Sequence, residues 1–223
     1  MTKPRIGGAL GALALAVALL PVTTAATAAA SAPGNTTLAN AGAASATGQQ
    51  FNDPGDPGDP GDPGDDVPIG GQVELPATPG YDSVINYHSG KCLEVPGGST
   101  ADGVQLQQWS CNGKKHQKWN MRFARSFGGL RLYYVINEKS GKCLSVKGGS
   151  GANGTAIIQW PCHEGDQAEH FVLLKVLNAP GDTFVMQNIK TGKYPQVDGG
   201  SQANGAKVSL WKGQNKHHFW WHF

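Results

Sequence analysis

The sequence predicts an all-β fold built from three similar units, and repetition is the first observation behind this prediction. One block occurs at residues 89–111, 140–162 and 191–213, and its three copies align without a gap. Equivalent lysines and equivalent tryptophans are 51 residues apart throughout: Lys91, Lys142 and Lys193, and Trp109, Trp160 and Trp211. A fixed period of this kind indicates a repeat architecture.

The second observation is the pattern inside each copy. Short alternating stretches, such as residues 104–107, are separated by glycine-rich turns, which is typical of strands and hairpins. No stretch keeps an amphipathic helical period for three turns. Three units are too few for a propeller, and an open stack would need capping repeats, so a closed threefold β structure fits best.

The chain begins with a segment that we expect to be removed. In residues 1–30, Lys3 and Arg5 precede an apolar run from Ile6 to Leu20, and small residues follow, as in a secretory signal peptide. The run is shorter than the roughly 20 residues of a spanning helix. We therefore expect a secreted, extracellular protein with no membrane span.

Residues 31–80 are expected to form a disordered linker. Asp-Pro-Gly occurs four times in succession at residues 53–64, and large apolar residues are scarce in this segment. Such a chain cannot build a core and remains extended. The folded domain is then predicted at residues 81–223, which contain nearly all the aromatic residues and every cysteine.

Charge is distributed unevenly between these segments. Residues 81–223 hold 16 Lys and Arg against 9 Asp and Glu, a formal charge of +7. The overall charge of +2 therefore combines a basic domain with an acidic linker. The sequence has no run of basic residues like a nucleic-acid-binding arm, so no nucleic-acid partner is expected.

The four cysteines should be paired in an exported chain. Three connectivities are possible, and the repeat favours one of them. Cys92 and Cys111, and likewise Cys143 and Cys162, are separated by 19 residues at equivalent places, and the third copy has lost both cysteines together. We therefore expect one disulfide within each of the first two copies.

Two further features recur in every copy. The first is a turn dipeptide whose glycine accepts left-handed geometry: Asp102-Gly103, Asn153-Gly154 and Asn204-Gly205. The second is an aromatic position after the shared block, assigned to Trp119, Phe171 and Trp220.

The repeated Cys-Leu-x-Val, Gly-Gly, Asn-Gly and Gln-x-Trp elements resemble the ricin B-chain type lectin module, which is a β-trefoil. The resemblance covers residues 81–223, with repeats at about 81–128, 129–180 and 181–223. It implies a β-trefoil with pseudo-threefold symmetry, in which Trp119, Phe171 and Trp220 are core aromatics.

The resemblance also implies one shallow sugar pocket per copy. Such a pocket uses an acid after Cys-Leu, a Gln two residues before an aromatic platform, the platform itself, and an Asn-Gln pair. The first copy matches best: Glu94 replaces the usual Asp, Gln107 and Trp109 match, and His116-Gln117 replaces the amide pair.

The other two copies depart further from this pattern. The second keeps Trp160 and adds His163, but Ser145, Ile158 and Ala168-Glu169 replace the other positions. The third keeps Trp211, with Gln196, Ser209 and His217-His218 elsewhere, and Pro195 is expected to alter its first strand. The sequence therefore predicts one good site, one weak site and one altered site.

Two functions remain open. The first is non-catalytic carbohydrate binding by a monomer, with galactose- or xylose-type sugars suggested by the resemblance. The alternative is a protein-binding or inhibitory scaffold whose sugar sites have lapsed, with the regularly spaced tryptophans in the core. Exposure of Trp109 favours the first. No nucleophile–base arrangement, metal-ligand spacing or cofactor motif is present, so we expect neither an enzyme nor a bound metal or cofactor.

Overall fold

The computed structural model describes residues 69–73, 75, 80–213 and 215–223. They all belong to one of the two units into which the chain divides, Ala43–Phe223. The expected signal peptide and the Asp-Pro-Gly tract lie outside the described residues. Among the described residues, no helix is long and apolar enough to cross a membrane.

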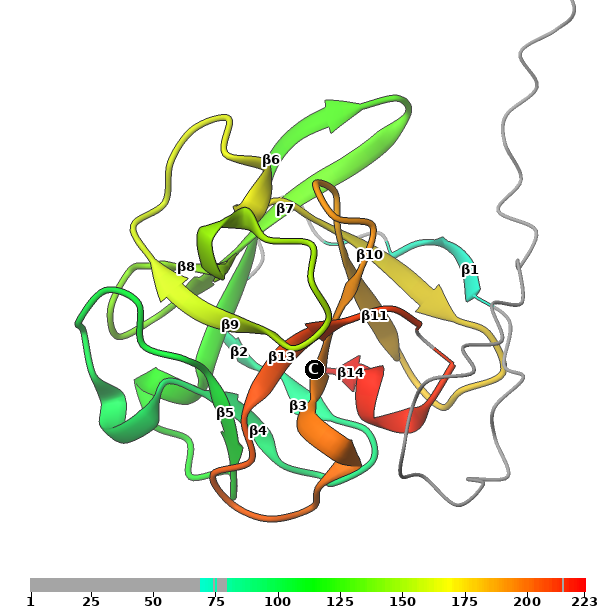
Figure 1. Cartoon of the computed structure of the whole chain (residues 1–223). Coiled ribbons are helices and arrows are strands. Elements are labelled where there is room, and N and C mark those ends of the chain that lie inside the picture. The colour runs from blue at the N-terminus through cyan, green and yellow to red at the C-terminus, as the bar shows by residue number, and fades with distance from the viewer. Residues whose placement is uncertain (1–68, 74, 76–79, 214) are drawn as a thin grey trace, which may run out of the picture. The chain divides into compact units, whose positions relative to one another are not determined.

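The described chain is built from strands joined by turns and short 3₁₀ segments (Figure 1). The strands are β1 (Ile69–Gln72), β2 (Asp82–Ser83), β3 (Ile85–Asn86), β4 (Cys92–Glu94), β5 (Gln107–Trp109), β6 (Lys118–Phe127), β7 (Leu130–Asn137), β8 (Cys143–Val146), β9 (Thr155–Trp160), β10 (Phe171–Val176), β11 (Phe184–Asn188), β12 (Tyr194–Val197), β13 (Val208–Trp211) and β14 (Trp221–His222). The 3₁₀ segments are η1 (Pro96–Gly98), η2 (Lys115–Gln117), η3 (Lys147–Gly149), η4 (Gln167–Glu169), η5 (Asp198–Gly200) and η6 (His217–Phe219).

The outer strands of the three copies close into a ring. β2 pairs with β6, β6 with β7, β7 with β10, β10 with β11, β11 with β14, and β14 with β3. Because β2 and β3 are neighbouring parts of one extended segment, separated only by Val84, the ring has no free edge. This is the closed threefold β structure that the sequence predicts.

The inner strands of each copy form a hairpin: β4–β5, β8–β9 and β12–β13. The three hairpins have the same register, pairing Cys92 with Trp109, Cys143 with Trp160, and Tyr194 with Trp211. Neighbouring hairpins are joined by backbone pairing of Ser209 with Ala156 and by bridges from Gln105 to Ile158 and Gln107 to Lys207. The hairpins therefore support one another.

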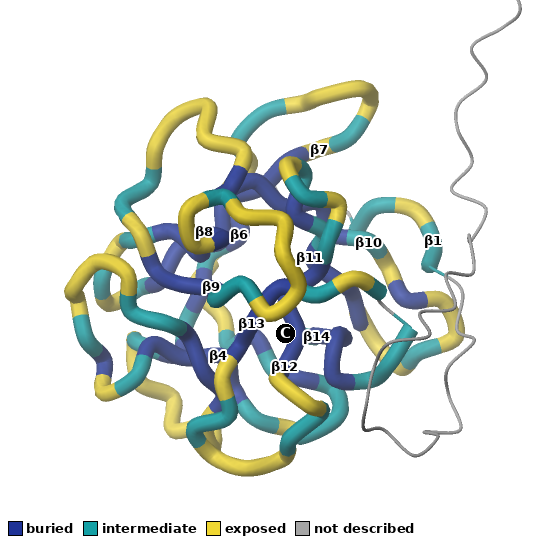
Figure 2. Tube along the Cα trace, in the orientation of Figure 1, coloured by how far each residue is buried: buried dark blue, intermediate teal, exposed yellow. Residues whose placement is uncertain are grey.

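The main core repeats with the same period as the sequence. It contains equivalent residues from the three copies, among them Val84, Val135 and Met186; Val95, Val146 and Val197; and Leu106, Ile157 and Val208. Figure 2 shows buried segments inside the body and exposed turns around it. Removing these side chains from water, at about 25 cal/mol per Å² of apolar area, drives the three copies to pack as one body.

Both expected disulfides are present, Cys92–Cys111 and Cys143–Cys162. Each ties the first inner strand of its copy to the segment that follows the tryptophan of the second inner strand. A bridge closing a loop of this length stabilises a fold by about 3 kcal/mol in the chain-entropy account. The third copy has Tyr194 in the position of the first cysteine, and its buried ring packs in a second apolar cluster.

The third member of the core aromatic set is Trp221, not the predicted Trp220. Trp119 pairs with Asn137 and Phe171 with Asn188, but the residue that pairs with Asn86 is Trp221, not Trp220. Trp221 lies in the main core with Trp119 and Phe171, whereas Trp220 is buried in the second cluster. The second copy has one more residue between Trp160 and Phe171 than the first has between Trp109 and Trp119. The spacing alone therefore does not decide between Trp220 and Trp221 in the third copy.

Two other expectations are corrected. Packed structure is present before the expected boundary at Tyr81, because β1 pairs with β10 and both Val73 and Leu75 pack against the core. Pro195 does not disrupt its strand: β12 continues through it and pairs it with Leu210. The Pro195 carbonyl accepts a hydrogen bond from Nε1 of Trp221 at 3.4 Å.

Candidate functional site

The first copy brings its predicted polar residues together around the Glu94 carboxylate. Gln107 lies opposite Glu94 across the β4–β5 hairpin, and its Nε2 donates to Oε1 of Glu94 at 2.8 Å. Gln117 is the last residue of η2, and its Nε2 donates to the other oxygen, Oε2, also at 2.8 Å. Bonds of this kind to an ionised group are stronger than neutral ones and fix all three side chains.

The orientation of Gln117 is itself determined by its surroundings. Its Oε1 accepts the backbone N–H of Asn112 at 2.8 Å, so its Nε2 must face Glu94 and the Ser110 carbonyl. His116, the preceding residue, places Nε2 3.5 Å from Oε2 of Glu94. Glu94 and Gln117 are buried, and the site therefore has a polar floor with little freedom to rearrange.

Trp109 lies at the end of β5 and is 40% exposed. It is not held by its own copy alone. A Cβ atom added to Gly205, in the third copy, would lie 3.6 Å from Cζ3 of Trp109, so the ring rests against that turn. Asn204 in the same turn accepts the backbone N–H of Ser110 at 2.9 Å. The ring is therefore an exposed but supported surface.

The same arrangement occurs at the other two tryptophans, in a cyclic order. Trp160 of the second copy rests against Gly103 of the first, and Trp211 of the third against Gly154 of the second. Each of these glycines has a positive φ, between 75° and 84° for Gly103, Gly154 and Gly205, which favours glycine at the turn. Trp160 is 39% exposed, and Trp211 is half-buried.

The third copy also contributes a side chain to the first site that the sequence did not predict. Lys207 donates from Nζ to Oε1 of Gln107 at 3.0 Å. Because this bond uses the oxygen of the amide, it directs the Gln107 Nε2 toward Glu94. The 51-residue period could not indicate Lys207, since its partner belongs to another copy.

The second copy has a different polar floor. Ser145 and Ile158 occupy the positions of Glu94 and Gln107 and pair across β8–β9. Glu169, in the position of Gln117, is buried and accepts the backbone N–H of His163 at 2.7 Å. Its other oxygen lies 3.3 Å from Nδ1 of His163.

These contacts set the charge properties of the second copy. Burial raises the pKa of the Glu169 carboxyl, and the two contacts with His163 partly oppose this rise. The predicted site residues Trp160 and His163 are both exposed, but the carboxylate beside them is turned toward His163 and lies beneath it. The second copy thus keeps the aromatic platform without the amide and acid of the first.

The third copy is altered further. Gln196 and Ser209 pair across β12–β13, and the Ser209 hydroxyl donates to Asp198 rather than to a site residue. The residues equivalent to His116-Gln117 are His218-Phe219, not His217-His218. The buried asparagines establish this alignment, because Asn137 donates to the His116 carbonyl and Asn86 to the His218 carbonyl. A buried phenyl ring therefore replaces the second amide.

Three buried asparagines follow the 51-residue period although the predicted site does not include them: Asn86, Asn137 and Asn188. Each donates to backbone carbonyls of the 3₁₀ segment next to it in the ring and accepts from the Ser or Thr three residues later. They hold η2, η4 and η6 in place. Among the described residues, no group of three or more His, Cys, Asp or Glu could hold a metal ion.

Comparison with solved structures defines the fold class. A designed 3-fold symmetric protein, ThreeFoil, is 27% identical with a TM-score of 0.57, covering 64% of this chain and 96% of its own. The Rhizoctonia solani agglutinin has a TM-score of 0.57 at 18% identity, covering 68% and 96%. The fold is a β-trefoil with pseudo-threefold symmetry.

The sequence matches the model of the ricin-type beta-trefoil lectin domain-like family over residues 72–160 and 126–211. The chain belongs to this family. An exo-beta-1,3-galactanase from Clostridium thermocellum is also similar, at 27% identity and a TM-score of 0.56, with 66% of this chain covered. The match spans only 30% of the galactanase chain.

Proposed function

We propose that this protein binds carbohydrate without catalysis, and that the first copy holds its main site. The observation that carries the proposal is the exposed Trp109 ring next to the Glu94–Gln107–Gln117 cluster. An aromatic face packs against the apolar C–H face of a pyranose, while carboxylate and amide groups pair with its hydroxyls. Membership of a lectin-like family supports the same function.

Galactose-containing glycans are the first class to test. The match to part of an exo-beta-1,3-galactanase supports this choice, and xylose-type glycans are the next class. In an exported chain, as residues 1–30 predict, the targets would be extracellular polysaccharides. Three tryptophans on one rigid body could engage one long chain at several points and so increase its affinity.

The test is a binding screen of the whole protein against a glycan array and against insoluble galactan and xylan, with Trp109→Ala and Trp160→Ala in parallel. We expect Trp109→Ala to weaken binding at least about tenfold, as loss of an aromatic anchor does. For neutral glycans Trp160→Ala is the matched control, because its ring is equally exposed but Ser145 and Ile158 replace the acid and amide.

Equal losses in the two variants would show that exposure of the ring, and not the polar cluster, determines binding. If the folded wild-type protein binds no glycan, carbohydrate binding is contradicted and the alternative, a protein-binding scaffold, is favoured. The departures at Ser145, Ile158 and Phe219 are the observations that favour this second candidate.

A further inference from the structure

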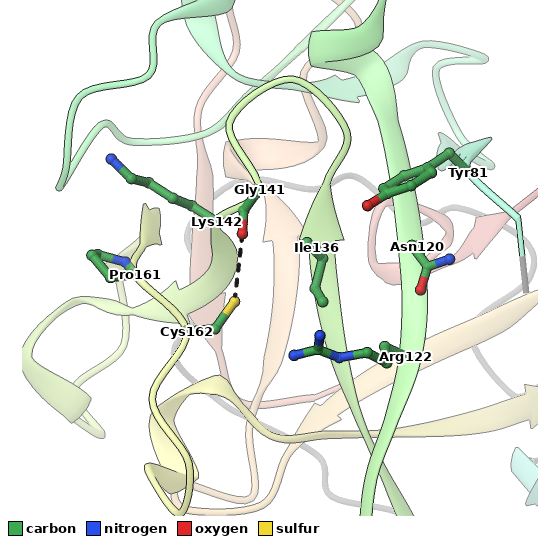
Figure 3. A pocket seen from close by; sticks show the side chains of 8 residues that line it. All are labelled: Tyr81, Asn120, Arg122, Ile136, Gly141, Lys142, Pro161 and Cys162. Carbon is green, nitrogen blue, oxygen red and sulfur yellow. Dashed lines mark hydrogen bonds between the residues drawn. The ribbon is translucent and has the colours of Figure 1, made fainter. Parts of the chain in front are cut away.

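A pocket of about 660 Å³ lies away from the first site, between β6 and the segment that follows β9 (Figure 3). Its wall includes Tyr81, Asn120, Arg122, Lys142, Pro161 and Cys162. Two cationic side chains and an exposed phenol ring line it, and no Asp or Glu does. None of the predicted sugar-contact residues contributes to it.

Arg122 provides the uncompensated charge. Its side chain is exposed, and its guanidinium carbon lies 5.4 Å from the centre of the Tyr134 ring. The Tyr134 hydroxyl donates to the His163 carbonyl at 3.2 Å, so the ring that supports the guanidinium is itself fixed. Within the described part of the chain, Arg122 forms no ion pair. Figure 3 shows its guanidinium pointing from β6 toward Cys162.

Lys142 differs from Arg122 because its charge is already paired. Its Nζ contacts the Asp102 carboxylate and the Thr100 carbonyl. The pocket therefore carries one net positive charge at Arg122. A guanidinium presents paired N–H donors that match the two oxygens of a carboxylate or a sulfate, and it remains charged at any physiological pH. The chemistry of the pocket fits an anionic group.

The wall of the pocket includes the chain neighbour of the second copy's aromatic platform. Pro161 in its wall directly follows Trp160, and the Lys142–Asp102 pair adjoins Gly103, against which the Trp160 ring rests. Tyr81, 43% exposed, offers a second aromatic surface on the side of the pocket across from Pro161 (Figure 3).

We propose that this pocket binds the anionic substituent of an acidic glycan, with Arg122 pairing the charge and a neighbouring sugar resting on Trp160. The inference rests on the proposed function and adds a ligand class to it. It also gives the second copy a role that its own polar floor does not provide. The anion is the carboxylate of a uronic acid or a sulfate ester, which share this chemistry.

The experiment compares matched pairs of probes by titration calorimetry with the whole protein. One pair is glucuronoxylan before and after carboxyl reduction, and the other is a sulfated galactan before and after desulfation. Arg122→Gln removes the charge from the pocket. Arg131→Gln is the control, because Arg131 is exposed on the same β6–β7 hairpin, over the Phe123 ring at 5.0 Å, but does not line the pocket.

The wild type should bind the acidic member of at least one pair roughly tenfold more tightly than its neutral partner. Arg122→Gln should remove this preference and leave neutral binding unchanged, Arg131→Gln should keep it, and added salt should reduce it. The pair that shows the preference identifies carboxylate or sulfate as the ligand.

Equal binding of acidic and neutral glycans by the wild type would overturn the inference and leave the proposed function intact. Equal losses in Arg122→Gln and Arg131→Gln would also overturn it, because a general surface charge would then explain the preference. Absence of binding to all four glycans would overturn the inference, whereas the proposed function is contradicted only if the glycan array also shows no binding.

Discussion

The first and second copies share a backbone and a platform but differ in the chemistry beneath it. Trp109 and Trp160 have the same exposure and rest on the same kind of turn. In the first copy the carboxylate is on β4, where two amides hold it; in the second it is at the end of η4, turned to His163. The scaffold therefore determines the exposure of the ring, and the two copies differ in three polar positions beneath it.

The largest expected effect separates the scaffold from the site. Trp119→Ala should lower the free energy of unfolding by about 3–5 kcal/mol, because it removes a buried aromatic ring from the core. It also removes the bond from Nε1 to the Leu93 carbonyl at 2.9 Å. Urea unfolding measures this change. Trp109→Ala is the control and should unfold close to the wild type; an equal loss there would place Trp109 in the structural core.

The second prediction converts one copy into the other. In a Trp109→Ala background, which silences the first site, the changes Ser145→Glu, Ile158→Gln and Glu169→Gln give the second copy the polar residues of the first. We expect binding of the same sugar to return, with at least about a tenfold gain over the background, since charge-assisted hydrogen bonds to hydroxyls are restored. Calorimetric titration measures the gain.

Glu169→Gln alone in the same background is the control, and it should restore little. If the triple change folds normally but gains nothing, the difference between the copies does not lie in these three positions. Support from Lys207 would then be the next candidate, since it is a contact that the second copy lacks in this form.

The smallest expected effect concerns pH. Because burial raises the pKa of Glu169 above its usual 4.5, the protonated form is favoured by folding. Its stabilising contribution is complete below pH 4.5 and is lost as the pH rises through the pKa of the folded state. Glu169→Gln should therefore raise Tm by about 2–4 °C at pH 8, and by less as the pH falls toward 4.5.

The measurement is a series of thermal melts of both proteins across this pH range. Glu164→Gln, at an exposed carboxylate of the same turn, is the control and should leave Tm unchanged at each pH. A Tm difference that stays constant with pH would show that hydrogen bonding, rather than the buried charge, distinguishes Glu169 from Gln117.

The fold could be predicted because the core residues that produce it are repeated in the sequence. Equivalent core residues recur every 51 positions, so the repeat indicates the closed threefold structure. The two disulfides follow from equal cysteine spacings and from the loss of both cysteines together in the third copy. The period failed where its spacing changed. One extra residue between Trp160 and Phe171, compared with Trp109 to Trp119, left Trp220 and Trp221 as rival candidates, and only the pairing of Asn86 with Trp221 decides between them.

The site was predicted less completely. The resemblance placed Glu94, Gln107, Trp109, His116 and Gln117 in one copy, and the structure brings all five together. It could not place Lys207 or Gly205, because these contacts cross between copies and depend on the order in which the copies meet. The Arg122 pocket has no equivalent in the repeat, and so no periodic signal marks it.

The cyclic contacts have a consequence for how the molecule can be divided. The platform of the first copy rests on the third, that of the second on the first, and that of the third on the second. In a peptide with a single copy, the tryptophan ring would therefore have no glycine turn to pack against. Three such peptides on separate chains could still provide these turns to one another, since every contact joins a copy to its neighbour in the ring. The three copies are arranged like the subunits of a symmetric trimer, but they belong to one polypeptide. A circular permutation of the copies along the chain would therefore keep all of these contacts.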